Sequence, residues 1–514
     1  MQDVKIVIGG NFGDEGKGLM TDYFAAEAVK SGRETLVICS NGGAQRGHTV
    51  TTPSGIRHVF HHFGSGTLAG ADTWLPRYFI VNPMIFMDEY EELLENGVVF
   101  EIPGPEQKIK QIEGVMKERK VFMDPECPVT TPYDMITNQI IEEHRGAGRH
   151  GSCGVGIWET LLRDGLSLGE MADLSDEQLQ NYLRTDCREQ MYRRFDRLGI
   201  CEIPERWKDI LEDEGLIRSY IYDFRQMCSL VRMKGVDVLR EYDRLIFEAG
   251  QGLLLDRCRK DYGCHTTPSN TGLRNPAELL REYLHMPDAE SAVRHIYKDT
   301  GDNEYLYMPD TGNTCRKVEI LRRLYGQWEP ASPMMDVEVY DQRKPAYPMV
   351  EVEMYDQREP ACLMVDAEMY DQRKPAYPMV DSEMYDQRKP AYPMMDVEVC
   401  YVTRTYLTRH GTGPFPEECG KDEINPDMRD LTNVPNPHQG TLRYGRLEEN
   451  AFIRRIREDF DSERLAGRVK MRMTAAVTHV NEYAGEIAKM ADYISDGETR
   501  ECVRCSRTRR SRCA

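Results

Sequence analysis

The sequence contains no run of about 18 apolar residues, so it offers no candidate for a membrane-spanning helix. It begins directly with the largely apolar run Val4–Ile8 and shows no sign of a secretory signal. Basic residues are outnumbered, at 66 Lys and Arg against 86 Asp and Glu, and the net charge of −20 disfavours nucleic-acid binding because a phosphate backbone would be repelled. The 15 cysteines lack the spacing of a disulfide framework, which is typical of a reducing compartment. We therefore expect a cytoplasmic protein that binds neither membranes nor nucleic acid, although single nucleotides are not excluded.

A complete Walker A motif is also missing, although its general architecture is present. The strand-like run Val4–Ile8 is followed by a glycine-rich loop and then by the helix-like segment Leu19–Ala26, an order that directs backbone N–H groups at an anion. Lys17 adds a positive charge, but Asn11 stands where Walker A requires its first glycine, and Gly18 replaces the magnesium-binding hydroxyl. The sequence therefore predicts a phosphate loop of another kind and disfavours a generic P-loop NTPase or kinase.

Asp14 lies inside this loop, where a carboxylate repels phosphate unless it has a function. A bridging Mg²⁺ ion or a role in proton abstraction would make its presence favourable. A second polar glycine loop, Gly42–Thr49, holds His48 between Gly47 and Thr49, a setting that favours a catalytic histidine over a structural one. The alternative is a tight strand-to-helix turn with solvated charges, which short motifs of this kind also produce.

Five segments in chain order resemble the motifs of adenylosuccinate synthetases. They are Gly13–Gly18 (GDEGKG), Gly47–Thr49 (GHT), Phe247–Asp256 (FEAGQGLLLD), Thr266–Thr271 (TTPSNT) and Arg404–Pro416, which is similar to the family's K-x-YSTRVG-x-GPFPTE. That family joins L-aspartate to C6 of inosine monophosphate (IMP) in purine nucleotide biosynthesis, using GTP and a 6-phosphoryl intermediate to give adenylosuccinate. The resemblance implies a C–N ligase that acts as a homodimer. It also implies the fold, an α/β structure with a large central, mostly parallel sheet, flanking helices and the phosphate loop after the first strand.

The resemblance assigns chemical roles to a few residues. Asp14 would accept the N1 proton of the purine and bind Mg²⁺, which turns the 6-oxygen into a nucleophile. His48 would donate to the charge that develops as the γ-phosphoryl group is transferred, and the carbonyl of Gly47 would be a second metal ligand. Aspartate then displaces the phosphate. Arg163 matches an arginine that in the family reaches the nucleotide of the partner subunit.

The candidate binding residues fall into three groups according to the expected ligand. The nucleoside triphosphate would be bound by Gly13, Asp14, Glu15, Gly16, Lys17, Gly18, Gly47, His48, Thr49, His479, Asn481, Ser495 and Gly497. The purine monophosphate would be bound by Gln45, Arg46, Arg163, Gln251, Thr267 and by Ser152 and Cys153 in a loop similar to the family's GTTGRG. L-Aspartate would be bound by His438, Gln439, Gly440, Thr441 and Arg443.

Two departures from the family pattern leave the substrates open. The aspartate loop of the family is arginine-rich, since a dicarboxylate requires bidentate donors, but here only Arg443 remains, with Arg446 nearby. The guanine-reading segment T-K-x-D corresponds to Thr478–Asn481, so the carboxylate that accepts from guanine N1–H and its N2 amine is lost. These changes fit a phage branch that uses GMP or dGMP as acceptor and ATP or dATP as donor, giving 2-amino-adenylosuccinate. Since that branch usually carries serine where this chain has Asp14, we rank IMP first.

A 15-residue unit recurs through residues 333–397, with copies that begin at Pro333, Pro348, Leu363, Pro378 and, in part, at Pro393. Each unit predicts one short strand and a proline-bearing turn. The repeats could form a binding array, which would suit an inactive homologue that acts as a scaffold. We favour expansion of a surface loop without function, because the copies are nearly identical and long insertions cost little closure entropy.

The expected organisation is therefore a catalytic domain interrupted once. Residues 1–332 and 398–500 would form this domain, and the repeats at 333–397 would be inserted into it. Residues 501–514 form a basic tail that we expect to be disordered. Its three cysteines are too few for a zinc site, which needs four ligands.

Overall fold

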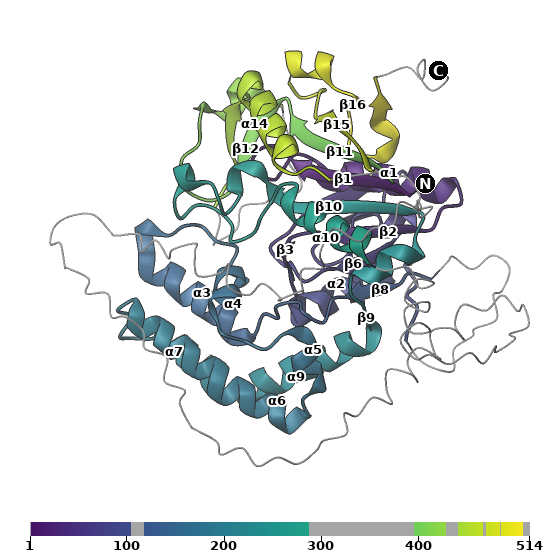
Figure 1. The fold of residues 1–514 in the computed structure, drawn as a ribbon. Helices are drawn as coiled ribbons and strands as arrows, with labels where there is room; N and C mark the ends of the chain where they lie inside the picture. Colours follow the sequence, from purple (N-terminus) through teal and green to yellow (C-terminus); the bar gives the residue numbers. More distant parts are fainter. Residues whose placement is uncertain are drawn as a thin grey trace, which may run out of the picture. The chain divides into compact units, whose positions relative to one another are not determined.

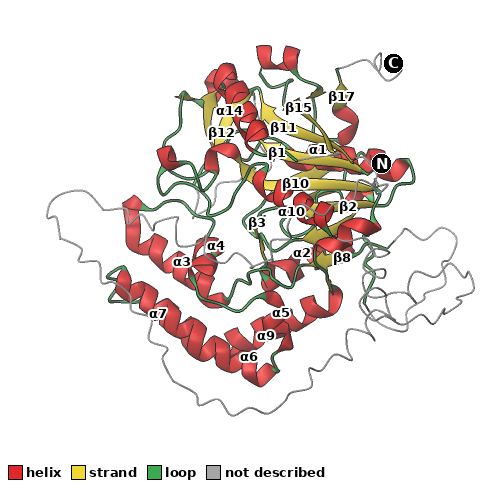
Figure 2. Ribbon diagram, viewed as in Figure 1, coloured by secondary structure: helices red, strands yellow, loops and turns green. Residues whose placement is uncertain are grey.

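The fold is built on one large sheet, described here from a computed structural model that covers residues 2–103, 118–286, 395–427, 440–465, 469–483 and 485–506. All of these residues except Met286 belong to one compact unit. Within them the sheet has ten strands in the order β17-β16-β15-β11-β1-β10-β2-β6-β8-β9 (Figures 1 and 2). Every neighbouring pair is parallel except β16 and β17. The strands are β1 Asp3–Gly9, β2 Thr35–Cys39, β6 Asp72–Leu75, β8 Val121–Met123, β9 Arg232–Met233, β10 Arg244–Gly252, β11 Met395–Arg404, β15 Val469–Thr478, β16 Tyr493–Ser495 and β17 Val503–Cys505.

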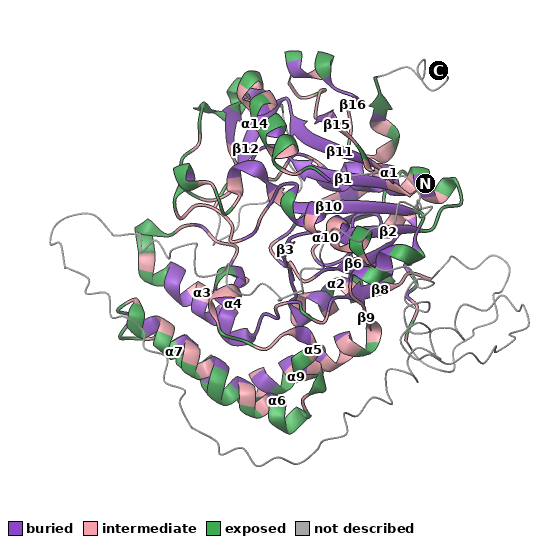
Figure 3. Ribbon diagram, viewed as in Figure 1, coloured by how far each residue is buried: buried purple, intermediate pink, exposed green. Residues whose placement is uncertain are grey.

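The strand β1 lies inside the sheet, between β10 and β11. Its sequence is rich in β-branched residues and does not alternate with polar ones, because both faces are covered. Figure 3 shows β1, β10 and β11 almost entirely buried. The fold class predicted from the sequence is therefore confirmed.

Helices cover the sheet and extend beyond it (Figure 1). They are α1 Lys17–Lys30, α2 Pro83–Glu95, α3 Pro132–Arg145, α4 Ile157–Leu162, α5 Leu168–Asp173, α6 Asp176–Tyr182, α7 Arg188–Arg197, α8 Glu205–Glu212, α9 Glu214–Leu230, α10 Arg274–His285, α13 Lys421–Ile424 and α14 Glu449–Ser462. Short helical turns are η1 Thr67–Ala69, η2 Gly146–Gly148, η3 Leu183–Cys187, η4 Val236–Glu241, η5 Leu253–Leu255, η6 Lys260–Tyr262, η8 Glu486–Met490 and η9 Arg500–Cys502. No helix in the described part of the chain combines the length and hydropathy needed to cross a bilayer.

Smaller sheets complete the structure beside the large one. One joins β12 Tyr406–Arg409, β14 Arg443–Arg446 and β13 Glu418–Cys419. Two others pair β3 Gly42–Gly43 with β7 Phe79–Ile80, and β4 His48–Thr51 with β5 Arg57–Phe60. The pair β4 and β5 fixes the backbone that carries His48.

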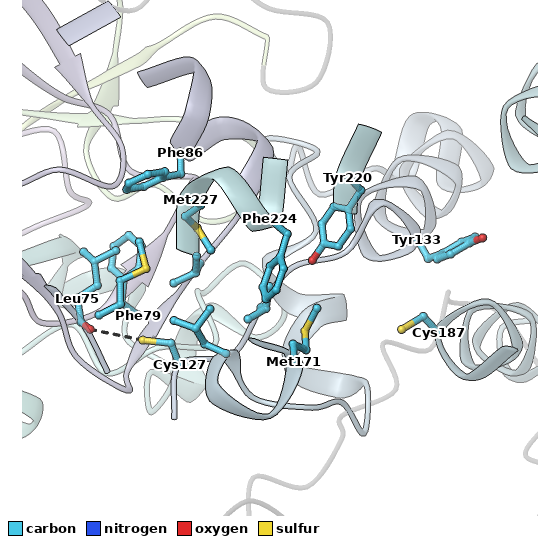
Figure 4. Close-up of a cluster of buried hydrophobic side chains, with 14 of the residues drawn as sticks. Leu75, Phe79, Phe86, Cys127, Tyr133, Met171, Cys187, Tyr220, Phe224 and Met227 are labelled. Atoms are coloured by element: carbon cyan, nitrogen blue, oxygen red, sulfur yellow. Dashed lines mark hydrogen bonds between the residues drawn. The ribbon is translucent and has the colours of Figure 1, made fainter. Parts of the chain in front are cut away.

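Two buried clusters hold the helices in place. Leu19, Met20 and Phe24 of α1 pack against residues of β1, β2 and β10, which fixes the helix that follows the phosphate loop. A second cluster unites β6 with α2, α5 and α9, and Figure 4 shows Phe86, Met171, Phe224 and Met227 gathered around Cys127 and Leu75. Burial of such side chains contributes about 1.5–3 kcal/mol each.

Parallel strands place their carboxyl ends at one edge of the sheet. The loop after β1, the loop after β2, the end of β10, Arg404 at the end of β11 and His479 after β15 therefore all lie at this edge. Residues far apart in the sequence meet there.

The structure corrects two of the expected boundaries. Strand β11 begins at Met395, so residues 395–397, which we assigned to the insertion, pair with β1 and β15. Residues 501–506 are not a disordered tail, because Val503–Cys505 form β17 and cover the edge strand β16. The free backbone groups of β16 are the physical reason for this pairing. The full repeats lie outside the described residues.

Candidate active site

A cavity at this edge of the sheet is lined by the phosphate loop, the loop around His48 and the segment after β15. Its lining residues are Gly13, Asp14, Gly16, Lys17, Gly18, Leu19, Gly47, His48, Thr49, Thr51, Arg57, Arg404, Tyr406, His479, Asn481, Glu482, Gly497 and Glu498. They include every residue predicted to bind the nucleoside triphosphate except Glu15 and Ser495. The fold thus brings together segments separated by more than 400 positions.

The phosphate loop is held by its own side chains. Glu15 is buried, and its Oε1 accepts from the backbone N–H groups of Asn11 at 3.0 Å and Gly13 at 2.7 Å. Lys17 is also buried, and its Nζ lies 3.4 Å from Oε2 of Glu15. Gly16 has a positive φ of 93° and starts α1 without a side-chain cap, which leaves the N-terminus of the helix to bind an anion. Glu15 therefore supports the loop from within and does not line the cavity.

His48 is bound on both sides by β10. Its Nδ1 lies 2.8 Å from Oε1 of Glu248, and its Nε2 lies 3.0 Å from the carbonyl oxygen of Gly250. Burial lowers the pKa of His48, and the Glu248 carboxylate offsets part of this effect. Burial alone would raise the pKa of Glu248, but His48 and Arg46 beside it lower that pKa to about 2. Glu248 is therefore a buried anion that orients both His48 and Arg46.

Several buried polar atoms of Gln45, Arg46 and Thr49 have no hydrogen-bond partner among the described residues. Both side-chain atoms of Gln45, the Nε and Nη1 of Arg46 and the Oγ1 of Thr49 are buried without a hydrogen bond. Unpaired buried polar atoms cost about 1–3 kcal/mol each, so their presence in the described structure indicates a site for a polar ligand. Gln251, another residue predicted to bind the monophosphate, accepts from Asn41 at 3.3 Å through its Oε1.

The loop that resembles GTTGRG already holds an anion from its own chain. Glu142 accepts from the N–H groups of His150, Gly151 and Ser152 at 2.8–3.3 Å. Burial alone would raise the pKa of Glu142, but Arg145 and these N–H groups lower it. These three N–H groups are therefore not available to a phosphate.

The side chains of the same loop are placed differently. The Oγ of Ser152 contacts Oδ1 of Asn138 at 3.1 Å, and Cys153 is partly buried. The rings of His150 and His265 lie 5.3 Å apart, which brings this loop close to the segment that carries Thr267. The two predicted monophosphate segments are thus neighbours.

Arg163 is fully engaged within its own chain. Its guanidinium donates to Asp134 at 2.9 Å, to the hydroxyl of Tyr182 at 2.6 Å and to the carbonyl of Val129 at 2.8 Å. Burial alone would lower its pKa, but Asp134 raises it. A role toward a partner subunit would require these bonds to open, and this role stays a prediction.

Of the residues expected to bind aspartate, Gly440, Thr441 and Arg443 are described, and none of these three lines the cavity. Arg443 forms a bidentate pair with Glu418 and donates to the carbonyls of Gly411 and Gly413. Gly440 has a positive φ of 73°, and Thr441 is exposed. His438 and Gln439 lie outside the described residues.

The segments expected to contact the donor base also contribute His479, Asn481 and Gly497 to the lining of the cavity. His479 is partly buried and has a positive φ of 57°, an uncommon conformation for a residue other than glycine that often marks a functional site. Burial lowers its pKa well below the usual range, so the ring is neutral. Asn481 is exposed, while Ser495 is buried and donates to the carbonyl of Gly497 at 2.9 Å.

The site suits Mg²⁺ held mainly by substrate. No group of three or more His, Cys, Asp or Glu with metal-binding geometry occurs in the described part of the chain. Asp14 and Gly47 both line the cavity. Mg²⁺ is commonly bound by one or two protein oxygens together with substrate phosphates, so this small donor set fits the ion.

Sequence reasoning missed Leu19, Thr51, Arg57 and Glu498 of the cavity lining, and four further residues of the site. Arg404, Tyr406 and Glu482 line the cavity, and Glu248 lies beneath it. Arg404 and Glu248 belong to segments that the sequence resemblance had singled out, but their contacts depend on which strands are neighbours. Glu482 carried no local signal.

Comparisons with known proteins identify a family. A family model described as adenylosuccinate synthetase matches residues 6–278. The adenylosuccinate synthetase of Alkaliphilus metalliredigens is 28% identical over 259 residues, which are 49% of this chain and 52% of that protein. The chain thus spans about half the length of the curated relatives that it matches.

Two solved structures align with nearly the whole chain. The fully ligated adenylosuccinate synthetase from Plasmodium falciparum aligns over 98% of this chain and 100% of its own, with a TM-score of 0.52 and 14% identity, which shows a common fold. The succinoaminodeoxyadenylate synthetase of cyanophage S-2L, bound to dGMP and dATP, aligns over 99% of this chain and 96% of its own, with a TM-score of 0.48 and 11% identity.

Proposed function

Because the chain belongs to the adenylosuccinate synthetase family, we propose that it joins L-aspartate to C6 of a purine nucleoside monophosphate and hydrolyses a nucleoside triphosphate. The observation that carries this proposal is the shared cavity, where a phosphate loop with Asp14 and Lys17 faces His48. Gln45 and Arg46, whose buried side chains carry unpaired polar atoms among the described residues, directly precede Gly47 and His48 in the sequence and indicate where a polar substrate would bind.

In this proposal each residue of the site has one chemical role. Asp14 would accept the N1 proton of the base, and the N-terminus of α1 with Lys17 would bind the triphosphate. His48 would donate from Nε2 to the oxygen that gains charge, for which Nε2 has to leave the carbonyl of Gly250. Glu248 holds the other side of the ring throughout.

Asp14 and the carbonyl of Gly47 would hold Mg²⁺, which when bound neutralises charge on the phosphates. IMP is the first acceptor we propose because Asp14 is present. GMP or dGMP with ATP or dATP is the second, because Asn481 stands where a guanine reader needs a carboxylate. A homodimer completed by Arg163 belongs to the same proposal.

The direct test measures product formation with every pairing of the candidate acceptor and donor nucleotides. Full-length protein would be incubated with L-aspartate and Mg²⁺ and each pairing of IMP, GMP or dGMP with GTP, ATP or dATP, and products would be identified by mass. We expect an aspartate adduct of at least one monophosphate together with phosphate release. If no pairing gave an adduct, the alternative of an inactive homologue would replace this proposal.

A single substitution tests the role of Asp14. Asp14→Asn keeps the shape of the side chain but cannot take the N1 proton, so turnover should fall roughly a thousandfold while triphosphate binding survives. Steady-state kinetics and equilibrium titration with a fluorescent triphosphate would measure the two effects. Asp461→Asn, at an exposed carboxylate of α14, is the control and should change neither. Near-native turnover of the Asp14 variant would show that the assigned base is wrong.

A further inference from the structure

The side chain of Arg404 binds both the main chain and the side chain of Asp14. It is the last residue of β11 and is buried, with 7% of its surface exposed. Its Nε donates to the carbonyl oxygen of Asp14 at 2.5 Å, and its Nη2 donates to Oδ2 of the same residue at 2.7 Å. Two bonds from one planar group restrict both the backbone and the carboxylate of Asp14.

The third guanidinium nitrogen of Arg404 connects the Arg404–Asp14 pair to Tyr406 and, through it, to Glu482. Nη1 donates to the hydroxyl of Tyr406 at 2.8 Å, and that hydroxyl in turn donates to Oε2 of Glu482. Burial raises the pKa of Tyr406, and Glu482 adds to this effect, so the hydroxyl keeps its proton. Asp14, Arg404, Tyr406 and Glu482 all line the cavity. The network therefore runs from the phosphate loop to the segment after β15.

The chemistry of the site explains why such a residue is needed. A carboxylate beside a phosphate loop is repelled by the phosphates and tends to turn away from them. Lys17 lies against Gly13 and Glu15, whereas Arg404 pairs with Asp14. A guanidinium supplies several donors in one fixed plane, which the single ammonium of a lysine does not.

We propose that Arg404 is a positioning residue of the reaction, which holds the carboxylate of Asp14 in place for the acceptor base while phosphate occupies the adjacent loop. This inference rests on the proposed function. Tyr406 and Glu482 fix the guanidinium from the opposite side.

The test compares Arg404→Ala, Arg404→Lys and Tyr406→Phe with Arg464→Ala, at an exposed arginine that pairs with Asp461. In the full-length protein, kcat and KM would be measured for both nucleotides, and folding would be followed by thermal unfolding. Arg404→Ala should lower kcat about a hundredfold with KM for the triphosphate unchanged within about threefold, since a misplaced base costs turnover and not binding. Tyr406→Phe should lower kcat by about tenfold or less, and Arg464→Ala should have no effect.

Guanidinium ions added to the assay supply the readout that a purely structural role would not change. They should raise the kcat of Arg404→Ala about tenfold and leave the kcat of Arg404→Lys unchanged, because the lysine side chain occupies the space that an added guanidinium ion would enter. If Arg404→Ala does not fold, the Lys and Phe variants still test the proposal. An unchanged kcat in folded Arg404 variants, or a rise in KM alone, would overturn the inference and leave the proposed function standing. A wild-type protein without activity would overturn the proposed function, and the inference with it.

Discussion

At the scale of single residues, the buried carboxylate of Glu248 organises the part of the site around His48. Glu248 accepts from Nη2 of Arg46 at 3.0 Å, from Ser65 through both its N–H and its hydroxyl, and it faces His48. Arg46 and Glu248 are both completely buried. An ion pair in such a place is retained because each charge would be costly without the other.

Replacement of this carboxylate should therefore destabilise the fold as well as the site. Glu248→Gln leaves Arg46 charged in the interior, and we expect the free energy of unfolding to fall by about 3–5 kcal/mol. Ser65→Ala, which removes one hydroxyl donor from the same carboxylate, should cost only about 1 kcal/mol. Denaturant titration of both variants would measure the difference. Equal effects would mean that the ion pair is not the stabilising feature.

We predict that single side chains also decide the donor base. His479 and Asn481 line the cavity. The resemblance to the family places them where its guanine-reading segment has Lys and Asp, so we infer that the carboxylate that makes guanine preferable is absent from position 481. We expect ATP or dATP to support turnover within about tenfold of GTP, a difference of ~1.4 kcal/mol. Asn481→Asp restores the carboxylate and should shift the preference toward GTP by about tenfold or more.

Competition kinetics with paired triphosphates would measure this preference directly. A wild-type preference for GTP above roughly a hundredfold would contradict the prediction. Glu482, a carboxylate that lines the same cavity, would then be the next residue to test as the base reader.

At the scale of elements, a buried charge also joins four strands of the large sheet. Glu398 of β11 accepts from Lys5 of β1 at 2.7 Å, from Arg472 and Thr474 of β15, and from Tyr493 of β16. Burial alone would raise the pKa of Glu398, but Lys5 and Arg472 lower it to about 2 from the ordinary 4.5. The contacts of this buried charge, together with apolar contacts, therefore help to fix the register of β11 relative to its neighbouring strands.

This carboxylate makes stability depend on pH. Because its pKa is lower in the folded state, Glu398 stabilises the fold above about pH 4.5, and this contribution of roughly 3 kcal/mol is lost as the pH falls from 4.5 toward 2. Glu398→Gln should therefore show a smaller loss of unfolding free energy between pH 5 and pH 3 than the wild type. The control is Glu486→Gln, at an exposed partner of Lys489, which should follow the wild-type curve. Parallel curves for wild type and the Glu398 variant would contradict the assignment.

At the scale of the whole molecule, the repeats interrupt a chain whose sheet continues on both sides of them. Strands β1 and β10 precede residue 287, and β11 and β15 follow residue 394. The last, partial copy of the unit, Pro393–Val399, has the same sequence as Pro333–Val339, and its residues from Met395 onward belong to β11. The repeated unit therefore contains the sequence of the first half of a core strand.

Deletion of residues 348–392 removes three whole units and tests their contribution. The residues before Pro393 would then be Arg343–Tyr347, which are identical to the Arg388–Tyr392 that they replace, so the local sequence before β11 is unchanged. We expect the unfolding temperature and the aspartate-dependent turnover to stay close to those of the full-length protein. A deletion variant that is well folded but inactive, or that does not fold, would show that the units are part of the enzyme.

The sequence by itself determined the local structures of this protein. β-Branched residues before the phosphate loop specified β1, Gly16 allowed the turn into α1, and the motifs around His48 and Phe247 indicated the family, because these features depend on neighbours in the chain. Only the tertiary structure decided which charges meet. Asp14 pairs with Arg404 across 390 positions, and Glu248 faces His48 across 200, because strand order and not sequence distance brings them to one edge of the sheet. For the same reason Glu142 fills the loop expected to cradle a phosphate, and residues 503–505 extend the sheet where a tail was expected.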